Sequence, residues 1–191
     1  MPVARRGAVM DSWDGYGPAE SATGQEFDRL VDFRMKESES AGLSDAIIRK
    51  QRAGSVHLFN LLRDAGVALL ADEVGMGKTY QAFGVMSLLW ARKPDAKILV
   101  VAPNKSVQRG WRSKYTDFIE QKARSSELCD PLMGRPVHPS RYCSNIVEFA
   151  REFVLNPRGL FVTRVSSFSN IRGSLANAAN AALEPEKKHP E

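Results

Sequence analysis

One short stretch limits the possible folds of this chain more than any other feature. Residues 71–79 read Ala-Asp-Glu-Val-Gly-Met-Gly-Lys-Thr. They follow a short apolar run, residues 67–71, and precede a segment in which apolar side chains recur at helical spacing. A glycine-rich turn between a buried strand and a helix is the setting of a phosphate-binding loop. The stretch therefore predicts an α/β fold with this loop at the end of a parallel strand.

Each residue type in this loop has a chemical reason to be there. Gly75 and Gly77 let the backbone turn tightly, so that its N–H groups and the helix N-terminus meet phosphate oxygens. Lys78 can reach the β- and γ-phosphates, and the Thr79 hydroxyl is the expected protein ligand to magnesium. The generic pattern would place glycine at position 72, where this chain has aspartate.

Two other interpretations of the loop stay open. It could be a glycine-rich turn that binds no ligand. Asp72 and Glu73 could instead end a strand as an acidic magnesium motif, but Gly-x-Gly-Lys-Thr follows too closely for two independent sites. The phosphate-binding interpretation is preferred because of the flanking strand and helix patterns.

The rest of the chain shows alternating strand and helix patterns. Apolar spacing predicts helices near residues 27–35 and 44–63, then a strand at 67–71, a helix from about 77 to 93, a strand at 98–102 and a helix from about 106 to 123. After a proline-containing loop, Asn145 is expected to cap a helix through Leu155, and Leu160 to Thr163 forms another strand. This order predicts a parallel sheet with helical crossovers.

These patterns divide the chain into four parts. We expect a flexible arm at residues 1–23, N-terminal helices at 24–65, an ATP-binding lobe at 66–172 and a poorly ordered tail at 173–191.

Residues 69–79 resemble motif I of the Swi/Snf-type, helicase-like ATPases of helicase superfamily two, in which aspartate stands where the generic loop has glycine. Two further segments support the resemblance. Residues 98–103, with Trp111 after them, are similar to motif Ia, and Phe161-Val162-Thr163, with Ser166 and Ser167, resembles motif Ib. The resemblance spans about residues 51–169.

The resemblance implies a partial RecA-like lobe, the first of a two-lobed motor that couples ATP hydrolysis to movement on duplex DNA. ATP and magnesium are the implied cofactors, with Thr79 as the magnesium ligand. Gln51 lies about where the family has an adenine-recognising glutamine. The implied nucleotide-binding residues are Gln51, Asp72, Glu73, Gly75, Met76, Gly77, Lys78 and Thr79.

A basic stretch is the candidate for nucleic-acid contact. Between Asn104 and Ser125 the chain has six basic and two acidic residues, so this stretch holds most of the net charge of +5. Lysine and arginine bind phosphates without reading sequence. We expect the contacts to come from Lys105, Arg109, Arg112 and Lys114; a solvated helix face is the alternative.

Two parts of the implied motor are not recognised in the sequence. After Arg164 no apolar strand ends in Asp-Glu, and no second lobe with its arginines follows. We therefore expect an ATP-binding portion of such an enzyme, truncated before the acidic motif and not catalytic alone. A nucleotide-binding or interaction module that has lost hydrolysis is the alternative, and a small P-loop phosphotransferase is disfavoured.

The bulk sequence limits the protein's location. No run approaches the roughly 18 apolar residues of a membrane span. No secretory signal pattern is found, and only two cysteines occur, which favours an intracellular protein without a disulfide framework.

Overall fold

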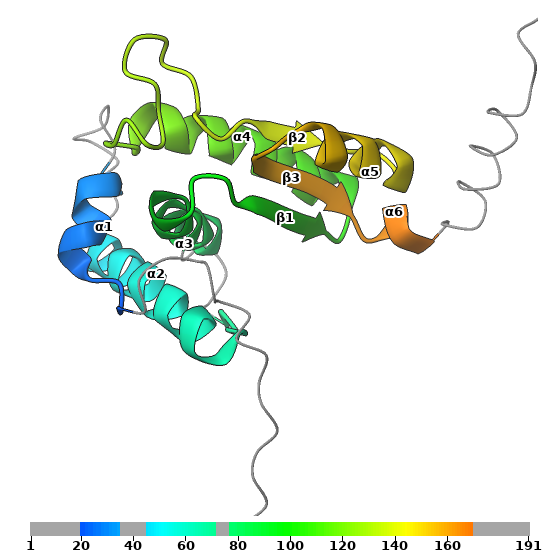
Figure 1. The fold of residues 1–191 in the computed structure, drawn as a ribbon. Coiled ribbons are helices and arrows are strands. Elements are labelled where there is room, and N and C mark those ends of the chain that lie inside the picture. Colours follow the sequence, from blue (N-terminus) through cyan, green and yellow to red (C-terminus); the bar gives the residue numbers. More distant parts are fainter. Residues whose placement is uncertain (1–19, 35–44, 72–76, 170–191) are drawn as a thin grey trace, which may run out of the picture. The chain divides into compact units, whose positions relative to one another are not determined.

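The computed structural model describes residues 20–34, 45–71 and 77–169. The chain forms two compact units, and each is described here by itself (Figure 1). The helical unit comprises residues 1–96 and 116–137, and the sheet unit comprises residues 97–115 and 138–191. Helix α4 (Lys105–Gln121) gives its first part to the sheet unit and its last turns to the helical unit.

The helical unit is built on three helices that contact one another, α1 (Gly24–Leu30), α2 (Asp45–Ala65) and α3 (Lys78–Arg92) (Figure 1). Their apolar faces meet in a core whose largest side chains are Phe27, Phe33, Phe59, Phe83, Leu88, Trp90 and Phe118. The indole N–H of Trp90 donates to the Ala96 carbonyl over 3.1 Å, so the ring is buried without an unsatisfied donor. Burial of these rings is the main stabilising contribution in this unit.

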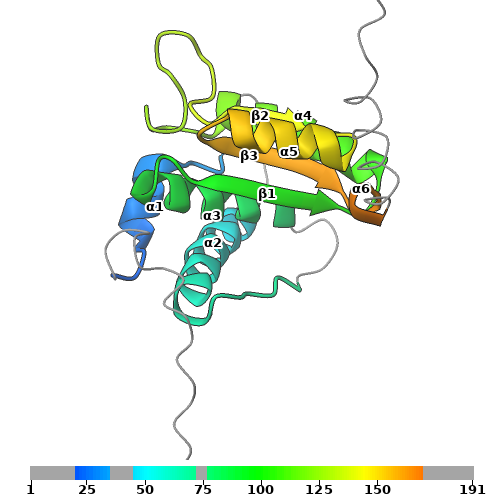
Figure 2. The same cartoon turned by 45° about the vertical axis from the view of Figure 1, so that its right-hand side comes forward.

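The sheet unit contains three parallel strands in the order β1 (Lys97–Ala102), β3 (Gly159–Arg164) and β2 (Ser140–Tyr142). Helix α5 (Ile146–Leu155) contacts the central strand β3, as does the short helix α6 (Ser166–Ser169) (Figure 2). Phe149 and Phe153 of α5 pack on Phe161 of β3, with ring centroids 6.3 and 5.3 Å from it. The middle of β3 is fully buried, as expected for a parallel strand covered on both faces.

The predicted α/β class is confirmed, and the parallel sheet with its helices is consistent with a partial RecA-like lobe. The helices α3, α4 and α5 and the strands β1 and β3 lie within a few residues of their predicted places. Asn145 caps α5 as expected, because its side chain accepts from the Glu148 N–H over 2.8 Å. Local signals thus located most of the elements.

The predicted strand at residues 67–71 is wrong. These residues have no regular secondary structure, and Val67 and Leu69 are 72% and 86% exposed. A parallel strand needs a neighbour for its backbone N–H and C=O groups, and no strand of the described residues pairs with this segment. Apolarity alone therefore did not determine the local structure.

Strand β2 is not predicted by the sequence pattern. It contains only Ser140, Arg141 and Tyr142, which offer no apolar run or clear alternation. The strand forms because its backbone pairs with residues 160–162 of β3. Only the tertiary contact reveals it.

The end of the predicted flexible arm is attached to the helical unit. The Ala22 N–H donates to Asn60 Oδ1 over 2.7 Å, and Arg92 donates to the Glu20 carbonyl over 2.8 Å. Arg92 also forms a bidentate pair with Glu26 of α1. Residues 20–26 are thus held against α2 and α3, while residues 1–19 and the predicted tail at 173–191 lie outside the described residues. Within the part described, no helix combines the length and apolarity needed to cross a membrane.

Candidate nucleotide-binding site

The candidate site is the start of helix α3, where the predicted phosphate-binding loop ends. Gly77 occupies the N-cap position with φ of 78° and ψ of 29°, in the left-handed region that favours glycine. Its carbonyl accepts the N–H groups of Tyr80 and Gln81 over 2.9 and 3.0 Å, which closes the first helical turn. Lys78 and Thr79 are the first two helical residues and are half-buried. A helix N-terminus attracts anions because its first N–H groups have no partner within the helix.

Gln51 of α2 lies against this turn. A Cβ atom built at Gly77 would overlap Nε2 of Gln51 and lie 2.9 Å from its Cδ, so only glycine leaves room for the amide. Gln51 is 2% exposed. The structure therefore brings together Gln51 and Gly77, two predicted site residues that are 26 positions apart in the sequence.

A close contact between α2 and α3 sets this arrangement. The Ser55 hydroxyl lies 2.9 Å from the Gln51 carbonyl and 3.2 Å from the Gln81 carbonyl, so it links the two helices. Gly54 of α2 and Gly84 of α3 lie where the two helices come close together, because a Cβ at either position would lie too close to a side chain of the facing helix. The lack of a side chain at these glycines allows the helices to meet and fixes Gln51 beside the loop.

The residues present fit a magnesium-bound phosphate in two respects. The αL conformation of Gly77 with the helix start behind it forms a turn that a side chain would obstruct. The Thr79 hydroxyl makes no hydrogen bond with the described residues, so it remains available as a magnesium ligand. No group of three or more His, Cys, Asp or Glu side chains within the described ranges could hold a metal ion by itself.

Half of the predicted loop lies beyond what the structure describes. Asp72, Glu73, Gly75 and Met76 belong to the segment 72–76, so their roles stay predictions. Gly77, Lys78, Thr79 and Gln51 are the predicted nucleotide-binding residues that the structure places together.

Lys122 is a residue that the sequence interpretation misplaced. It is one of the six basic residues between Asn104 and Ser125, but it is 4% exposed in the helical unit. Its Nζ donates to the Phe33 carbonyl over 2.8 Å and lies 5.5 Å from the ring centroid of Tyr80, the residue after Thr79. Burial lowers its pKa and, nearby, raises the pKa of the Tyr80 phenol. A surface lysine and a buried one look alike in sequence, so no local signal identified it.

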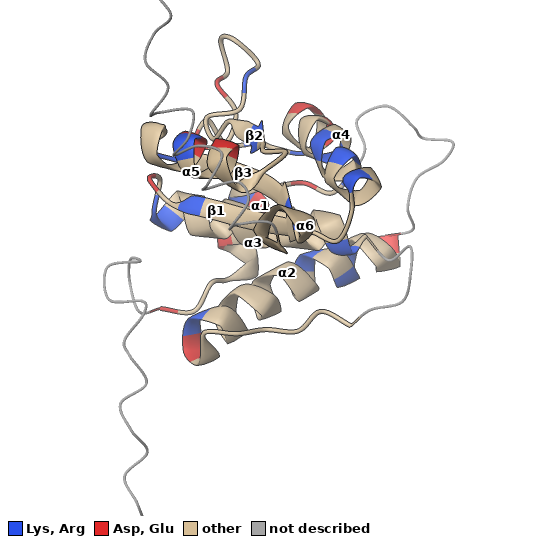
Figure 3. Cartoon of the chain, turned by 90° about the vertical axis from the view of Figure 1, so that its right-hand side faces the viewer, with Lys and Arg blue, Asp and Glu red and all other residues tan. Residues whose placement is uncertain are grey.

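The four predicted nucleic-acid residues lie in the sheet unit. Lys105, Arg109, Arg112 and Lys114 are all exposed on α4, and Figure 3 colours the Lys and Arg positions of the ribbon blue. The Arg112 guanidinium lies 5.6 Å from the ring centroid of Tyr142 in β2. An exposed group of cations on one helix is suited to phosphate contact.

Two comparisons with known proteins both indicate a helicase-like ATPase region. The sequence profile of the family described as "Type III restriction enzyme, res subunit" matches residues 43–184. The "Chromatin-remodeling ATPase INO80" of Neurospora crassa is 35% identical over 95 residues, which cover 49% of this chain and 4% of that protein. The chain thus corresponds to a very small part of this relative. No solved structure matches.

Proposed function

The chain belongs to the Type III restriction enzyme res subunit family, a helicase-like ATPase region, and on that premise we propose that it binds Mg-ATP at the start of α3. The observation that carries the proposal is the packing of buried Gln51 against Gly77, directly before Lys78 and Thr79. It joins the phosphate-binding turn to the residue expected to recognise adenine. Bound magnesium would neutralise charge on the β- and γ-phosphates, with Thr79 as its protein ligand.

Lys78 is the residue on which this proposal can be tested most directly. Calorimetry with Mg-ATP should detect binding by the full chain and none by Lys78→Ala, because the lysine supplies the charge next to the phosphates. Lys93→Ala is the matched control, since it removes the same charge at the other end of α3. Equal ATP affinity for the wild type and Lys78→Ala would refute the site.

The role of Gln51 needs a separate experiment because the side chain also packs against the loop. If Gln51 recognises the base, Gln51→Ala should reduce ATP binding and abolish a preference for ATP over GTP. If it only positions Gly77, both nucleotides should lose affinity equally. The ratio of the two affinities, and not either value alone, decides between these roles.

We propose further that this chain does not hydrolyse ATP by itself. Hydrolysis also needs an acid that helps hold magnesium and positions water, and an arginine finger contributes about 10³–10⁵ in rate. Residues 164–191 contain no Asp-Glu pair, so these residues do not supply that acid. With duplex DNA present, phosphate release should not exceed that of Lys78→Ala; turnover that depends on Lys78 would contradict this proposal.

DNA binding is the remaining element of the proposed function. The family indicates an interaction with nucleic acid, and the exposed cations of α4 support a contact with duplex DNA. Such contacts would be electrostatic and independent of sequence. A second RecA-like lobe is the other partner that the family resemblance implies for a motor of this kind.

A further inference from the structure

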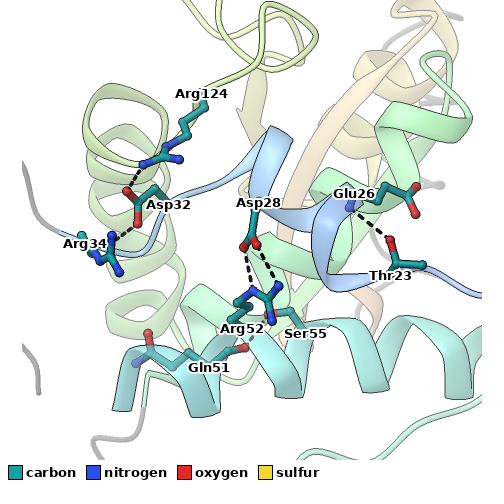
Figure 4. Close-up of polar contacts among 9 residues, drawn as sticks. All are labelled: Thr23, Glu26, Asp28, Asp32, Arg34, Gln51, Arg52, Ser55 and Arg124. Carbon is teal, nitrogen blue, oxygen red and sulfur yellow. Dashed lines mark hydrogen bonds and ion pairs between the residues drawn. The ribbon is translucent and has the colours of Figure 1, made fainter. Parts of the chain in front are cut away.

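A cavity of about 430 Å³ in the helical unit is separate from the residues of the phosphate-binding turn. Its walls come from the end of α1, the segment 31–34, the first turns of α2 and Arg124. The volume falls within the range of small-molecule sites, which is roughly 300–1,000 Å³. Figure 4 shows five of its lining residues as sticks: Asp28, Asp32, Arg34, Arg52 and Arg124.

The floor of the cavity is apolar. Phe27, Val31 and Phe33 are almost completely buried, and the rings of Phe27 and Phe33 pack with their centroids 5.3 Å apart. Ile48 of α2 adds a half-buried aliphatic wall. An apolar surface at the base of a cavity favours a ligand with a hydrophobic body.

The rim of the cavity is basic, with four arginines and two aspartates. Arg52 donates to both carboxylate oxygens of Asp28 over 2.6 and 2.7 Å, and Arg124 pairs with Asp32 (Figure 4). These contacts satisfy both carboxylates and use two of the guanidinium groups. The rim therefore presents net positive charge.

The other two arginines, Arg34 and Arg49, remain available for a ligand. Both are exposed, and neither guanidinium makes a hydrogen bond or ion pair with the residues that the structure describes. A guanidinium can bind a carboxylate, sulfonate or phosphate through two parallel N–H bonds. The rim thus supplies anion-binding groups above an apolar floor.

The cavity does not include the phosphate-binding turn. Gly77, Lys78 and Gln51 are not among its lining residues. Ile48 and Arg52 are one helical turn apart and share the face of α2 that lines the cavity, while Gln51 contacts Gly77. Gln51 is three residues after Ile48 and lies beside it on α2, so the two sites adjoin along this helix but have different lining residues.

We propose that this cavity is a second binding site, for a small organic anion with an aromatic or aliphatic body, held by Arg34 and Arg49 over the floor of Phe27, Val31 and Phe33. The site is distinct from the proposed nucleotide site and does not rest on it. Its ligand class follows from the combination of apolar floor, positive rim and volume.

The test uses the full chain and three probes with calorimetric detection. Naphthalene-1-sulfonate has both required features, 1-naphthol has the same rings without the charge, and inorganic sulfate has the charge without the rings. We expect the sulfonate to bind at least about tenfold more tightly than either of the others. Equal binding of sulfonate and naphthol would overturn the proposal.

Variants assign the binding to this cavity. Arg34→Gln with Arg49→Gln should weaken sulfonate binding about tenfold or more, while Lys50→Gln, the same charge change on the neighbouring residue of α2, should leave it unchanged. Ile48→Trp keeps all charges but fills the space, and it should also block binding. Unchanged thermal unfolding of these variants shows that they remain folded, and unchanged sulfonate affinity in the double arginine variant would refute the site.

Two further measurements keep this proposal separate from the nucleotide site. Lys78→Ala should retain sulfonate binding, and saturating Mg-ATP should not displace the sulfonate from the wild type. Displacement by Mg-ATP would assign the cavity to the nucleotide and overturn the proposal of a separate site.

Discussion

Substitution of Gly77 by alanine should destabilise the chain more than the same substitution at a glycine with a similar backbone. At φ of 78° the new Cβ costs about 1 kcal/mol of folding free energy. The Cβ must also displace the buried amide of Gln51, whose Cδ would be 2.9 Å away, and such overpacking costs about 1–3 kcal/mol. The expected loss is therefore about 2–4 kcal/mol.

Gly66 provides the matched control for this prediction. Its φ is 71°, but a Cβ at this position would meet no atom within 4 Å. Gly66→Ala should therefore lose only the backbone contribution of about 1 kcal/mol. Urea unfolding followed by circular dichroism gives both free energies of unfolding.

A double-mutant cycle identifies the contact as the cause of the difference. When Gln51→Ala removes the overlapping amide, adding Gly77→Ala should cost little more than Gly66→Ala. If Gly77→Ala alone is no more destabilising than Gly66→Ala, the packing of Gln51 against the loop, and with it the geometry of the candidate site, would be refuted.

Three other predictions concern charge and reactivity. Reversing Arg109 and Arg112 to glutamate should weaken binding to all DNA duplexes alike and reduce its salt dependence; unchanged affinity at low salt would exclude this helix face. Hydrogen bonds from Arg52 hold the pKa of Asp28 below its ordinary value of 3.8. The ionised carboxylate therefore stabilises the fold above pH 3.8. That contribution is lost as the pH falls through the lowered pKa. In acid unfolding titrations, Asp28→Asn should therefore lose less stability than the wild type does. Burial raises the pKa of the Cys143 thiol to about 11. A thiol reagent at neutral pH should therefore modify the half-buried Cys129 much faster than Cys143. Rapid labelling of Cys143 would contradict the structure.

The sequence could predict what depends on local signals. The Asn145 cap and the turn glycine Gly77 each have a conformational requirement that few residues meet, and both lie where expected. The buried strand at 160–163 was also predicted, because its residues form a short, nearly uninterrupted apolar run. These features need little knowledge of the rest of the fold.

Features that depend on distant partners could not be predicted in the same way. Residues 67–71 and 98–102 are similarly apolar, but only the second segment pairs with a neighbouring strand. The charge of Lys122 favours a surface position, whereas the turn after α4 directs its side chain to the carbonyl of Phe33, 89 residues away in the sequence. Likewise, the position of Gln51 beside Gly77 depends on the contact between α2 and α3, which joins distant parts of the sequence. In each case the deciding interaction joins residues far apart in the chain.

The attachment of residues 20–34 has a consequence for where the folding unit starts. The family match starts at residue 43, yet Phe27 and Phe33 lie in the core of the helical unit. Their backbone neighbours are also tied to the segment that follows α4, since the Asp32 N–H donates to the Lys122 carbonyl and the Arg124 N–H donates to the Leu30 carbonyl, both over 2.9 Å. A recombinant chain begun at the family boundary would leave the apolar surfaces of α2 and α3 exposed to water and prone to aggregation. For this protein, the boundary of shared ancestry and the boundary of autonomous folding are different positions.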